Sequence, residues 1–229
     1  MRYESRLVLG ILYDIHGNLD ALNAVLADAD TVGIDRWLLG GDYGTPSPYP
    51  LETLARLREL PNAIWIRGNG ERWLLDPPDD RPEVTETYER FRGQIPDEEV
   101  QWLVGLPDSV ELDGVLYVHG SPLGDDESFA AEPQEGEERL LTGVHDRTIV
   151  FGHSHLQFRR PGPEGTDLVN PGSVGMPLDG DIRAAWATWD GDFTFRRTGY
   201  DVAPAAAAYR RMGGNFGEFA AQRIEKGSD

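Results

Sequence analysis

Five short blocks hold the side chains best suited to chemistry in this chain, and each block stands where an apolar run ends. They are residues 14–18 (Asp-Ile-His-Gly-Asn), 41–43 (Gly-Asp-Tyr), 68–69 (Gly-Asn), 119–120 (His-Gly) and 152–155 (Gly-His-Ser-His). The blocks contain four of the 5 histidines, and the chain has no cysteine. Oxygen and imidazole donors without thiols suit a hydrolytic site that uses two metal ions. The sequence therefore predicts a metal-dependent hydrolase.

The composition predicts one compact domain that spans residues 1–229. A chain of 229 residues with 39% hydrophobic content is long enough to bury a substantial core. The lack of cysteine fits a reducing compartment. The apolar stretch 7–13 is too short to span a membrane and leads straight into the first block. We therefore expect a cytoplasmic protein without a membrane partner.

The charge of the chain disfavours long nucleic acids as partners. The formal net charge is -19, from 40 acidic and 21 basic residues, and Lys226 is the only lysine. Such a field repels polyanions, and no basic stripe offsets it. The acidic stretch 124–138 is expected to be a solvated loop. We expect a small substrate, and the sequence leaves assembly into a homo-oligomer open.

Strands and helices alternate in the first half of the chain. Apolar runs predict strands, and apolar residues at helical spacing predict helices between them. The expected strands are 7–13, 37–39 and 63–66, and the expected helices begin near residues 19 and 51. This alternation predicts a doubly wound sheet that carries the polar blocks along its carboxyl edge.

The rest of the chain predicts a second sheet and a small insertion. Helical patterns at 84–91 and from residue 96 indicate a helical, cap-like insertion at about 71–107. Asp113-Gly114 predicts a hairpin turn that opens the second sheet. We expect the strands 148–151, 156–160, 167–169, 183–189 and 193–198 to complete an antiparallel-rich second half, followed by a helix at 203–212 and an amphipathic C-terminal tail at 214–229.

Two of the blocks have the spacing of metal-ligand pairs. Asp14 and His16 are two residues apart at a strand end, which places both donors on one side of the chain, and His153 and His155 repeat this spacing. A lone pair of this kind is more often a cap, a turn or a core histidine. The order of all five blocks, each with an adjoining glycine, makes the metal interpretation stronger.

In this order the blocks resemble those of the calcineurin-like metallophosphoesterases, whose pattern runs Asp-x-His, Gly-Asp, Gly-Asn-His-Asp or Glu, His, and Gly-His-x-His. The resemblance spans residues 14–155, and Val-Asn-Pro-Gly-Ser at 169–173 looks like a signature of the small bacterial phosphodiesterases of that family. It implies an α/β fold, a four-layer α/β/β/α sandwich of two mixed β-sheets flanked by helices, with a dinuclear metal site at the carboxyl ends of strands.

The resemblance also implies a ligand set and a mechanism. One divalent ion would be held by Asp14, His16, Asp42 and His155, and the other by Asp42, Asn69, His119 and His153, with Asp42 bridging the two. Mixed nitrogen and oxygen ligands favour manganese, iron, zinc, nickel or cobalt. Asp42, Asn69 and His119 are the implied catalytic residues, and a hydroxide that bridges the ions would attack phosphorus in line.

The chain departs from the family pattern at Gly70, where many members have a histidine credited with assisting the leaving group. Glu71 keeps the acid that follows. General-acid assistance is typically worth about 10²–10⁴-fold, so we expect activity biased toward good leaving groups such as aryl esters. Asn18, Arg67 and Gly70 are the candidate substrate contacts. The phosphate-binding arginine that follows the Gly-Asp block in the protein phosphatases is absent, because residues 44–47 are Gly-Thr-Pro-Ser.

The favoured function is a metal-dependent phosphodiesterase that acts on small or nucleotide-like diesters. One alternative is a metal-binding scaffold for protein interactions with little activity, similar to the retromer subunit of this family. Another is a dinucleoside polyphosphate hydrolase, and a DNA-repair nuclease is disfavoured by the acidic composition. All seven ligand positions are intact, which favours an enzyme over a scaffold.

Overall fold

A computed structural model describes residues 7–228 of the chain. Its first sheet consists of the strands β1 (Leu9–Leu12), β2 (Arg36–Leu39), β3 (Ala63–Trp65), β9 (Ala184–Trp189) and β10 (Phe193–Thr198). Their order in the sheet is β10-β9-β1-β2-β3. Strands β1, β2 and β3 pair in parallel, and β9 pairs antiparallel with both β1 and β10.

The second sheet consists of the strands β4 (Ser109–Leu112), β5 (Val115–Val118), β6 (Thr148–Val150), β7 (Gln157–Pro161) and β8 (Asp167–Pro171). Their order in the sheet is β4-β5-β6-β8-β7, and the central strands β5, β6 and β8 are parallel. Apolar side chains of both sheets, among them Ile11, Leu38, Tyr117 and Val150, form one buried cluster between them. The predicted fold of two mixed sheets flanked by helices is confirmed.

Strands β9 and β10 belong to the first sheet, whereas the sequence placed them in the second half of the fold. Ile11 of β1 pairs with Ala187 of β9. Residues 184–188 are all buried, because β9 lies inside the sheet between β1 and β10. Apolar alternation identified the strand correctly, but it carries no information about a partner that lies more than 170 residues away.

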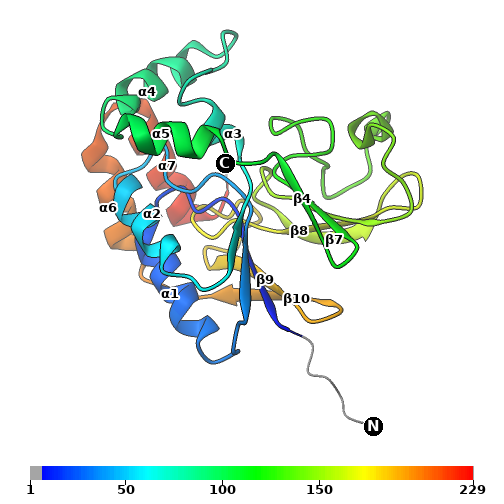
Figure 1. Cartoon of the computed structure of the whole chain (residues 1–229). Coiled ribbons are helices and arrows are strands. Elements are labelled where there is room, and N and C mark those ends of the chain that lie inside the picture. The colour runs from blue at the N-terminus through cyan, green and yellow to red at the C-terminus, as the bar shows by residue number, and fades with distance from the viewer. Residues whose placement is uncertain (1–6, 229) are drawn as a thin grey trace.

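Helices α1 (Leu19–Ala29), α2 (Pro50–Arg58), α6 (Val202–Met212) and α7 (Gly214–Lys226) lie on one side of the first sheet (Figure 1). Asn18 caps α1 by accepting a hydrogen bond from the Ala21 N–H, and the apolar face of α1 joins Trp186 in the core. The expected tail is the helix α7, which buries Ala220 and Ala221 against α6. The outer face of the second sheet is covered by residues 119–147, including the short 3₁₀ helix η1 (Glu137–Leu141).

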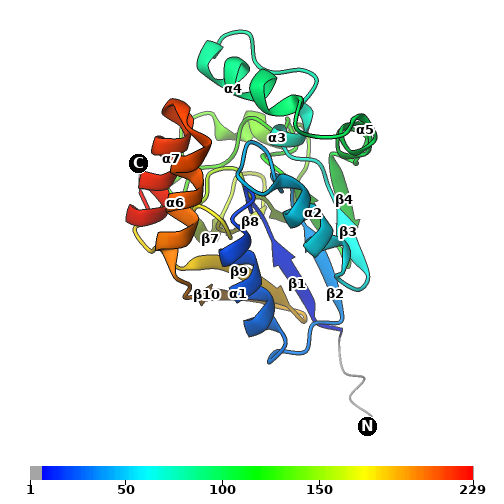
Figure 2. The ribbon, with the colours of Figure 1, turned by 90° about the vertical axis from the view of Figure 1, so that its left-hand side faces the viewer.

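Three helices stand between β3 and β4. They are α3 (Asn69–Arg72), α4 (Pro82–Arg92) and α5 (Asp97–Val104). Figure 2 shows α4 at the end of the molecule toward which β1 points. Trp102 of α5 packs edge-on against Trp65, and Tyr88 of α4 packs edge-on against Trp73. The cap-like insertion thus lies close to the carboxyl ends of the strands, although its standing as a separate unit stays a prediction.

Within residues 7–228, each helix is too short or too polar to cross a membrane. The cytoplasmic location stays a prediction.

Candidate metal centre

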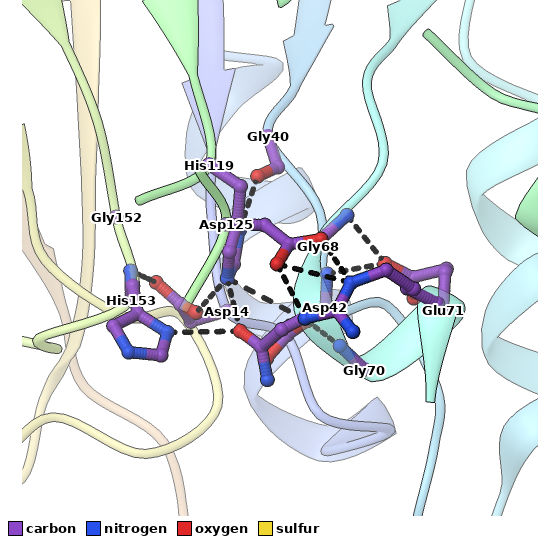
Figure 3. Close-up of polar contacts among 12 residues, drawn as sticks. Asp14, Gly40, Asp42, Gly68, Gly70, Glu71, His119, Asp125, Gly152 and His153 are labelled. Atoms are coloured by element: carbon purple, nitrogen blue, oxygen red, sulfur yellow. Dashed lines mark hydrogen bonds and ion pairs between the residues drawn. The ribbon is translucent and has the colours of Figure 1, made fainter. Parts of the chain in front are cut away.

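The strand ends of both sheets converge on one cluster of donors (Figure 3). In the first sheet, Asp14 and His16 follow β1, Asp42 follows β2, and Asn69 begins α3 after β3. In the second sheet, His119 follows β5, and His153 and His155 follow β6. Parallel pairing brings the ends of β1, β2 and β3 to one edge. Backbone hydrogen bonds join the loops, from His16 N to Asp42 O (2.8 Å) and from Gly152 N to His119 O (2.8 Å).

Asp14, His16 and His155 form the first group of the cluster. The two histidine Nε2 atoms are 3.0 Å apart. Asp14 Oδ1 lies 3.4 Å from His155 Nε2 and 3.9 Å from His16 Nε2. Asp42 Oδ2 lies 3.7 Å from His16 Nε2. These are the four side chains that the family resemblance assigns to one ion.

Asn69, His119 and His153 form the second group. Asn69 Oδ1 lies 2.9 Å from His119 Nε2 and 2.8 Å from His153 Nδ1. Asp42 Oδ1 lies 3.6 Å from His119 Nε2. Asp42 therefore turns one carboxylate oxygen toward each group, as a bridging ligand would. The structure brings all seven predicted ligands together, and their roles as ligands stay predictions.

Backbone carbonyls orient two of the imidazoles. His119 Nδ1 lies 2.8 Å from Gly40 O, and His155 Nδ1 lies 2.7 Å from Met176 O. A protonated Nδ1 that donates to a carbonyl leaves the Nε2 lone pair free, and in both residues Nε2 faces the cluster. Partners of this kind usually hold a metal-binding histidine in place.

One buried oxygen of the cluster has no hydrogen-bond partner among the described residues. Asp14 Oδ2 accepts a hydrogen bond from His153 N (2.9 Å), but Asp14 Oδ1 accepts none. An unsatisfied buried carboxylate oxygen is costly unless a cation compensates it. The donors around it are carboxylate, amide and imidazole, which suit divalent transition-metal ions. The residues present therefore fit a metal centre.

The backbone at the cluster is strained. Five of the seven candidate ligands have positive φ: Asp14 (52°), His16 (48°), Asp42 (56°), His153 (63°) and His155 (59°). Non-glycine residues in this region cost of order 1–3 kcal/mol each and gather at functional sites. The loops thus hold their donors at a local energetic cost, which supports a functional assignment.

The electrostatics of the cluster leave two of its histidines neutral. Burial and the charge of His155 lower the pKa of His16 to about 3, and burial and His119 lower that of His153 to about 4. Burial raises the pKa of Asp42 to about 7, aided by repulsion from Glu71 and Asp14. Burial lowers the pKa of His119, but the carboxylates of Asp42 and Asp14 outweigh it and raise the value to about 9. His16 and His153 are therefore neutral imidazoles that can bind a cation, whereas a cation would replace the proton on His119.

Glu71 holds the loops after β2 and β3 together. Its Oε2 accepts hydrogen bonds from Asp42 N (2.8 Å) and Gly68 N (2.9 Å), and its Oε1 accepts one from Tyr43 N (2.9 Å). The side chain is fully buried. The sequence showed only an acid at this position. Its contact with the loop of Asp42 depends on the fold.

Gly70 has no room for a side chain. A Cβ at this position would lie 2.8 Å from Asp42 Oδ1 and 3.1 Å from Tyr88 Oη. The Gly70 N–H donates to Asp42 Oδ1 (2.7 Å), and Tyr88 Oη donates to Thr45 O (3.0 Å). A histidine here would displace Tyr88 or Asp42. Sequence reasoning missed Tyr88, because it reaches the cluster from α4.

The other candidate substrate contacts are engaged with protein groups. Asn18 caps α1, and its Nδ2 donates to Gly175 O (2.8 Å) and Tyr200 Oη (2.9 Å). Arg67 donates to Val104 O (2.8 Å) and pairs with Asp108, and it also lines a cavity that reaches His119. Their roles with substrate stay predictions.

Arg72 was not expected from the sequence. It lies one helical turn after Asn69 and forms ion pairs with Asp125 and Asp126 of the acidic stretch, both at 2.7 Å. In Figure 3, Asp125 lies beside His119. This part of the acidic stretch therefore closes one side of the cluster and is not a free solvated loop. The fifth histidine, His145, is exposed and faces Asp146.

The sequence of residues 7–192 matches the calcineurin-like phosphoesterase superfamily domain. The chain is a calcineurin-like phosphoesterase. It is therefore a metallophosphoesterase, a hydrolase of phosphoric esters from a metal-dependent family.

This phosphoesterase is similar along nearly its whole length to a metallophosphoesterase from Sphaerobacter thermophilus. The two share 27% identity and a TM-score of 0.77, over 97% of this chain and 99% of the other. An uncharacterized protein of Methanocaldococcus jannaschii is 27% identical over 233 residues, which cover 86% of this chain and 90% of the relative. The fold is shared with the Escherichia coli phosphoesterase YfcE, at 24% identity and a TM-score of 0.51 over 81% of this chain and 90% of that one. The predicted family is confirmed.

Proposed function

We propose that this phosphoesterase is a phosphodiesterase that hydrolyses small or nucleotide-like diesters. The observation that carries the proposal is the convergence of seven donor side chains from five strand ends, the unpartnered Oδ1 of Asp14 among them. Intact donors on strained loops favour an active enzyme over a binding scaffold.

We assign two ions to this centre, drawn from manganese, iron, zinc, nickel and cobalt. Asp14, His16 and His155 would hold one, Asn69, His119 and His153 the other, and Asp42 both. Bound divalent ions would supply an activated water and positive charge beside the phosphate oxygens.

The chain's own residues give the site its geometry and its access. Carbonyls of Gly40 and Met176 orient His119 and His155, and Glu71 holds the loop that carries Asp42. His16 and His153 are the two partly exposed members of the cluster, so substrate would approach from their side.

The leaving group would depart without help from residue 70. Gly70 supplies no side chain, and Tyr88 fills the adjoining space. We therefore propose that the enzyme favours esters whose leaving group needs no proton, such as aryl esters. The lack of cysteine supports a reducing, cytoplasmic setting.

Hydrolysis of bis(p-nitrophenyl) phosphate tests the proposal. Metal-stripped protein should be inactive, and addition of manganese, nickel or zinc should restore turnover in the wild type. Asp42→Asn should lower the restored rate by at least about 100-fold if Asp42 holds both ions. A folded, metal-loaded protein without turnover would support the scaffold alternative instead.

A further inference from the structure

A cavity of about 540 Å³ lies beside the candidate metal centre and reaches His119. Its floor is the outer face of β5, where Leu116 and Val118 point away from the core between the sheets. Its walls include residues 121–125, which follow His119, and the polar side chains of Ser109 and Thr142. The volume is within the range of cavities that hold small organic ligands and exceeds what one phosphate group needs.

Three arginines line this cavity: Arg67, Arg72 and Arg147. We call it the arginine pocket. Each of these arginines is paired with at least one carboxylate: Arg67 with Asp108, Arg147 with Glu111, and Arg72 with both Asp125 and Asp126. A guanidinium group whose carboxylate partner is exposed can exchange it for an anionic ligand.

Two of the arginines, Arg67 and Arg147, form ion pairs that a ligand can displace. The partners of Arg67 and Arg147 are Asp108 and Glu111, whose side chains are 75% and 55% exposed. Ion pairs with exposed carboxylates contribute little stability, so a phosphate can replace them at small cost.

Arg72 differs from the other two because it pairs with two carboxylates, Asp125 and Asp126, and Asp125 is mostly buried. Asp125 accepts hydrogen bonds from both Nε and Nη2 of Arg72, and its side chain is 14% exposed. This pair fixes the wall of the pocket next to His119. Arg72 therefore acts as a positioning residue, and Arg67 and Arg147 are the groups available to an anion.

The pocket extends away from the metal centre along β5. Leu116 pairs with Ile149 in parallel register, so the backbone of Arg147 lies at the end of the floor far from His119. The apolar floor of Leu116, Val118 and Val144 lies between these ends. A ligand that fits has an apolar ring in the middle and an anionic group beyond it.

We propose that the arginine pocket binds the part of the substrate beyond the scissile phosphate, and that this part carries a second phosphate, as in a 5′-phosphorylated dinucleotide. The proposal rests on the phosphodiesterase function and names its substrate class.

The kinetic test compares two substrates that differ by one phosphate. Dithymidine monophosphate and its 5′-phosphorylated form are hydrolysed by the metal-restored enzyme, and kcat/KM is measured for both. We expect a preference of about 10-fold or more for the phosphorylated form, expressed in KM, since a phosphate held by arginine forms charge-assisted hydrogen bonds. Arg147→Gln, which removes the cation at the end of the pocket far from His119, should reduce this ratio toward one.

The matched control is Arg159→Gln. Arg159 also forms an ion pair with an aspartate, Asp167, but it lies on β7 outside the pocket. This variant should keep the wild-type preference. Equal kcat/KM for the two dinucleotides in an active enzyme would overturn the pocket assignment and leave the phosphodiesterase proposal standing.

A binding measurement separates the two proposals. Calorimetry on metal-stripped protein compares thymidine 5′-monophosphate with thymidine. We expect the monophosphate to bind at least about 10-fold more tightly in the wild type and in Arg159→Gln, but not in Arg147→Gln. If metal-loaded enzyme hydrolyses neither bis(p-nitrophenyl) phosphate nor the dinucleotides, the phosphodiesterase proposal fails. Failure of the monophosphate to bind better than thymidine would overturn the pocket.

Discussion

Asp42 lies between the two histidine groups of the cluster and close to two other carboxylates. It is buried, it faces His16 with one oxygen and His119 with the other, and Asp14 and Glu71 add negative charge nearby. Burial and these neighbours raise its pKa to about 7. A metal ion would compensate this charge, so the same residue destabilises the metal-free protein and stabilises the loaded one.

Asp42→Asn should therefore raise the Tm of the metal-stripped protein. The expected increase is at least about 2 °C, the shift that about 1 kcal/mol produces in a chain of this size. The same variant should lose most of the increase in Tm that manganese causes in the wild type. Calorimetry with and without metal measures both effects.

Asp190→Asn serves as the control, because Asp190 is an exposed turn residue far along the chain from the cluster. It should leave both Tm values unchanged. A lower Tm of metal-free Asp42→Asn would show that the carboxylate contributes structural bonds that outweigh its charge.

Glu71 acts on the cluster through the backbone. Glu71→Gln keeps one acceptor oxygen and turns an amide donor toward a buried N–H of Asp42, Tyr43 or Gly68. We expect a loss of about 1–3 kcal/mol in the free energy of unfolding and weaker metal binding. Urea denaturation beside the exposed control Glu111→Gln measures the first effect. An unchanged unfolding midpoint would show that the loops do not depend on these bonds.

The candidate metal ligands could be predicted from the sequence, but the residues that contact and position them could not. Asp14, His16, Asp42, Asn69, His119, His153 and His155 follow apolar strands, and that local pattern is visible in one dimension. Arg72 and Tyr88 reach the cluster from α3 and α4. Their contacts depend on how the insertion folds back, which local periodicity does not encode.

The packing of helices α3 and α4 limits the size of the side chain that residue 70 can carry. A Cβ at position 70 would meet Asp42 Oδ1 at 2.8 Å and Tyr88 Oη at 3.1 Å. Gly70→His should therefore lower the free energy of unfolding by about 1–3 kcal/mol, the usual cost of overpacking. Thermal unfolding compared with Gly93→His measures this cost, since a Cβ at Gly93 meets no atom within 4 Å.

Removal of the Tyr88 hydroxyl provides the room that histidine needs. The double variant Gly70→His/Tyr88→Phe should recover part of the lost stability relative to Gly70→His. If the leaving-group argument holds, it should also gain more on alkyl than on aryl diesters. Equal stability of the single and double variants would mean that Asp42, and not Tyr88, sets the limit at residue 70.

Helix α7 joins the end of the chain to the site. Ile224 is buried against α6, and Tyr209 of α6 donates a hydrogen bond to the carbonyl of His16. Ile224→Ala should destabilise the protein by about 2–4 kcal/mol, whereas Phe219→Ala, at a side chain that is 46% exposed, should cost much less. Urea denaturation distinguishes the two. Equal losses would show that α7 frays and does not pack.

At the scale of elements, the sequence identified most strands and helices but not all their partners. The short helix α3 was missed because Gly68-Asn69-Gly70 is a turn signal. The pairing of β9 with β1 was missed because strand partners are set by long-range packing of both faces. The expected tail proved to be a regular helix, since its small residues fit against α6.

At the scale of the whole molecule, the two sheets place every polar block at one edge. The blocks come from strands of both sheets, so the cluster forms only when the sheets pack together. The net charge of -19 acts at the same scale. It supports the proposal of a small substrate, and in the arginine pocket the displaceable ion pairs of Arg67 and Arg147 would provide contacts for an anion.

We propose that seven side chains hold two metal ions. Titration of metal-stripped protein with manganese, followed by calorimetry, tests this directly. We expect two ions per chain in the wild type and fewer than two in Asp42→Asn. Failure of the wild type to bind manganese, zinc, nickel, cobalt or iron at this cluster would contradict it.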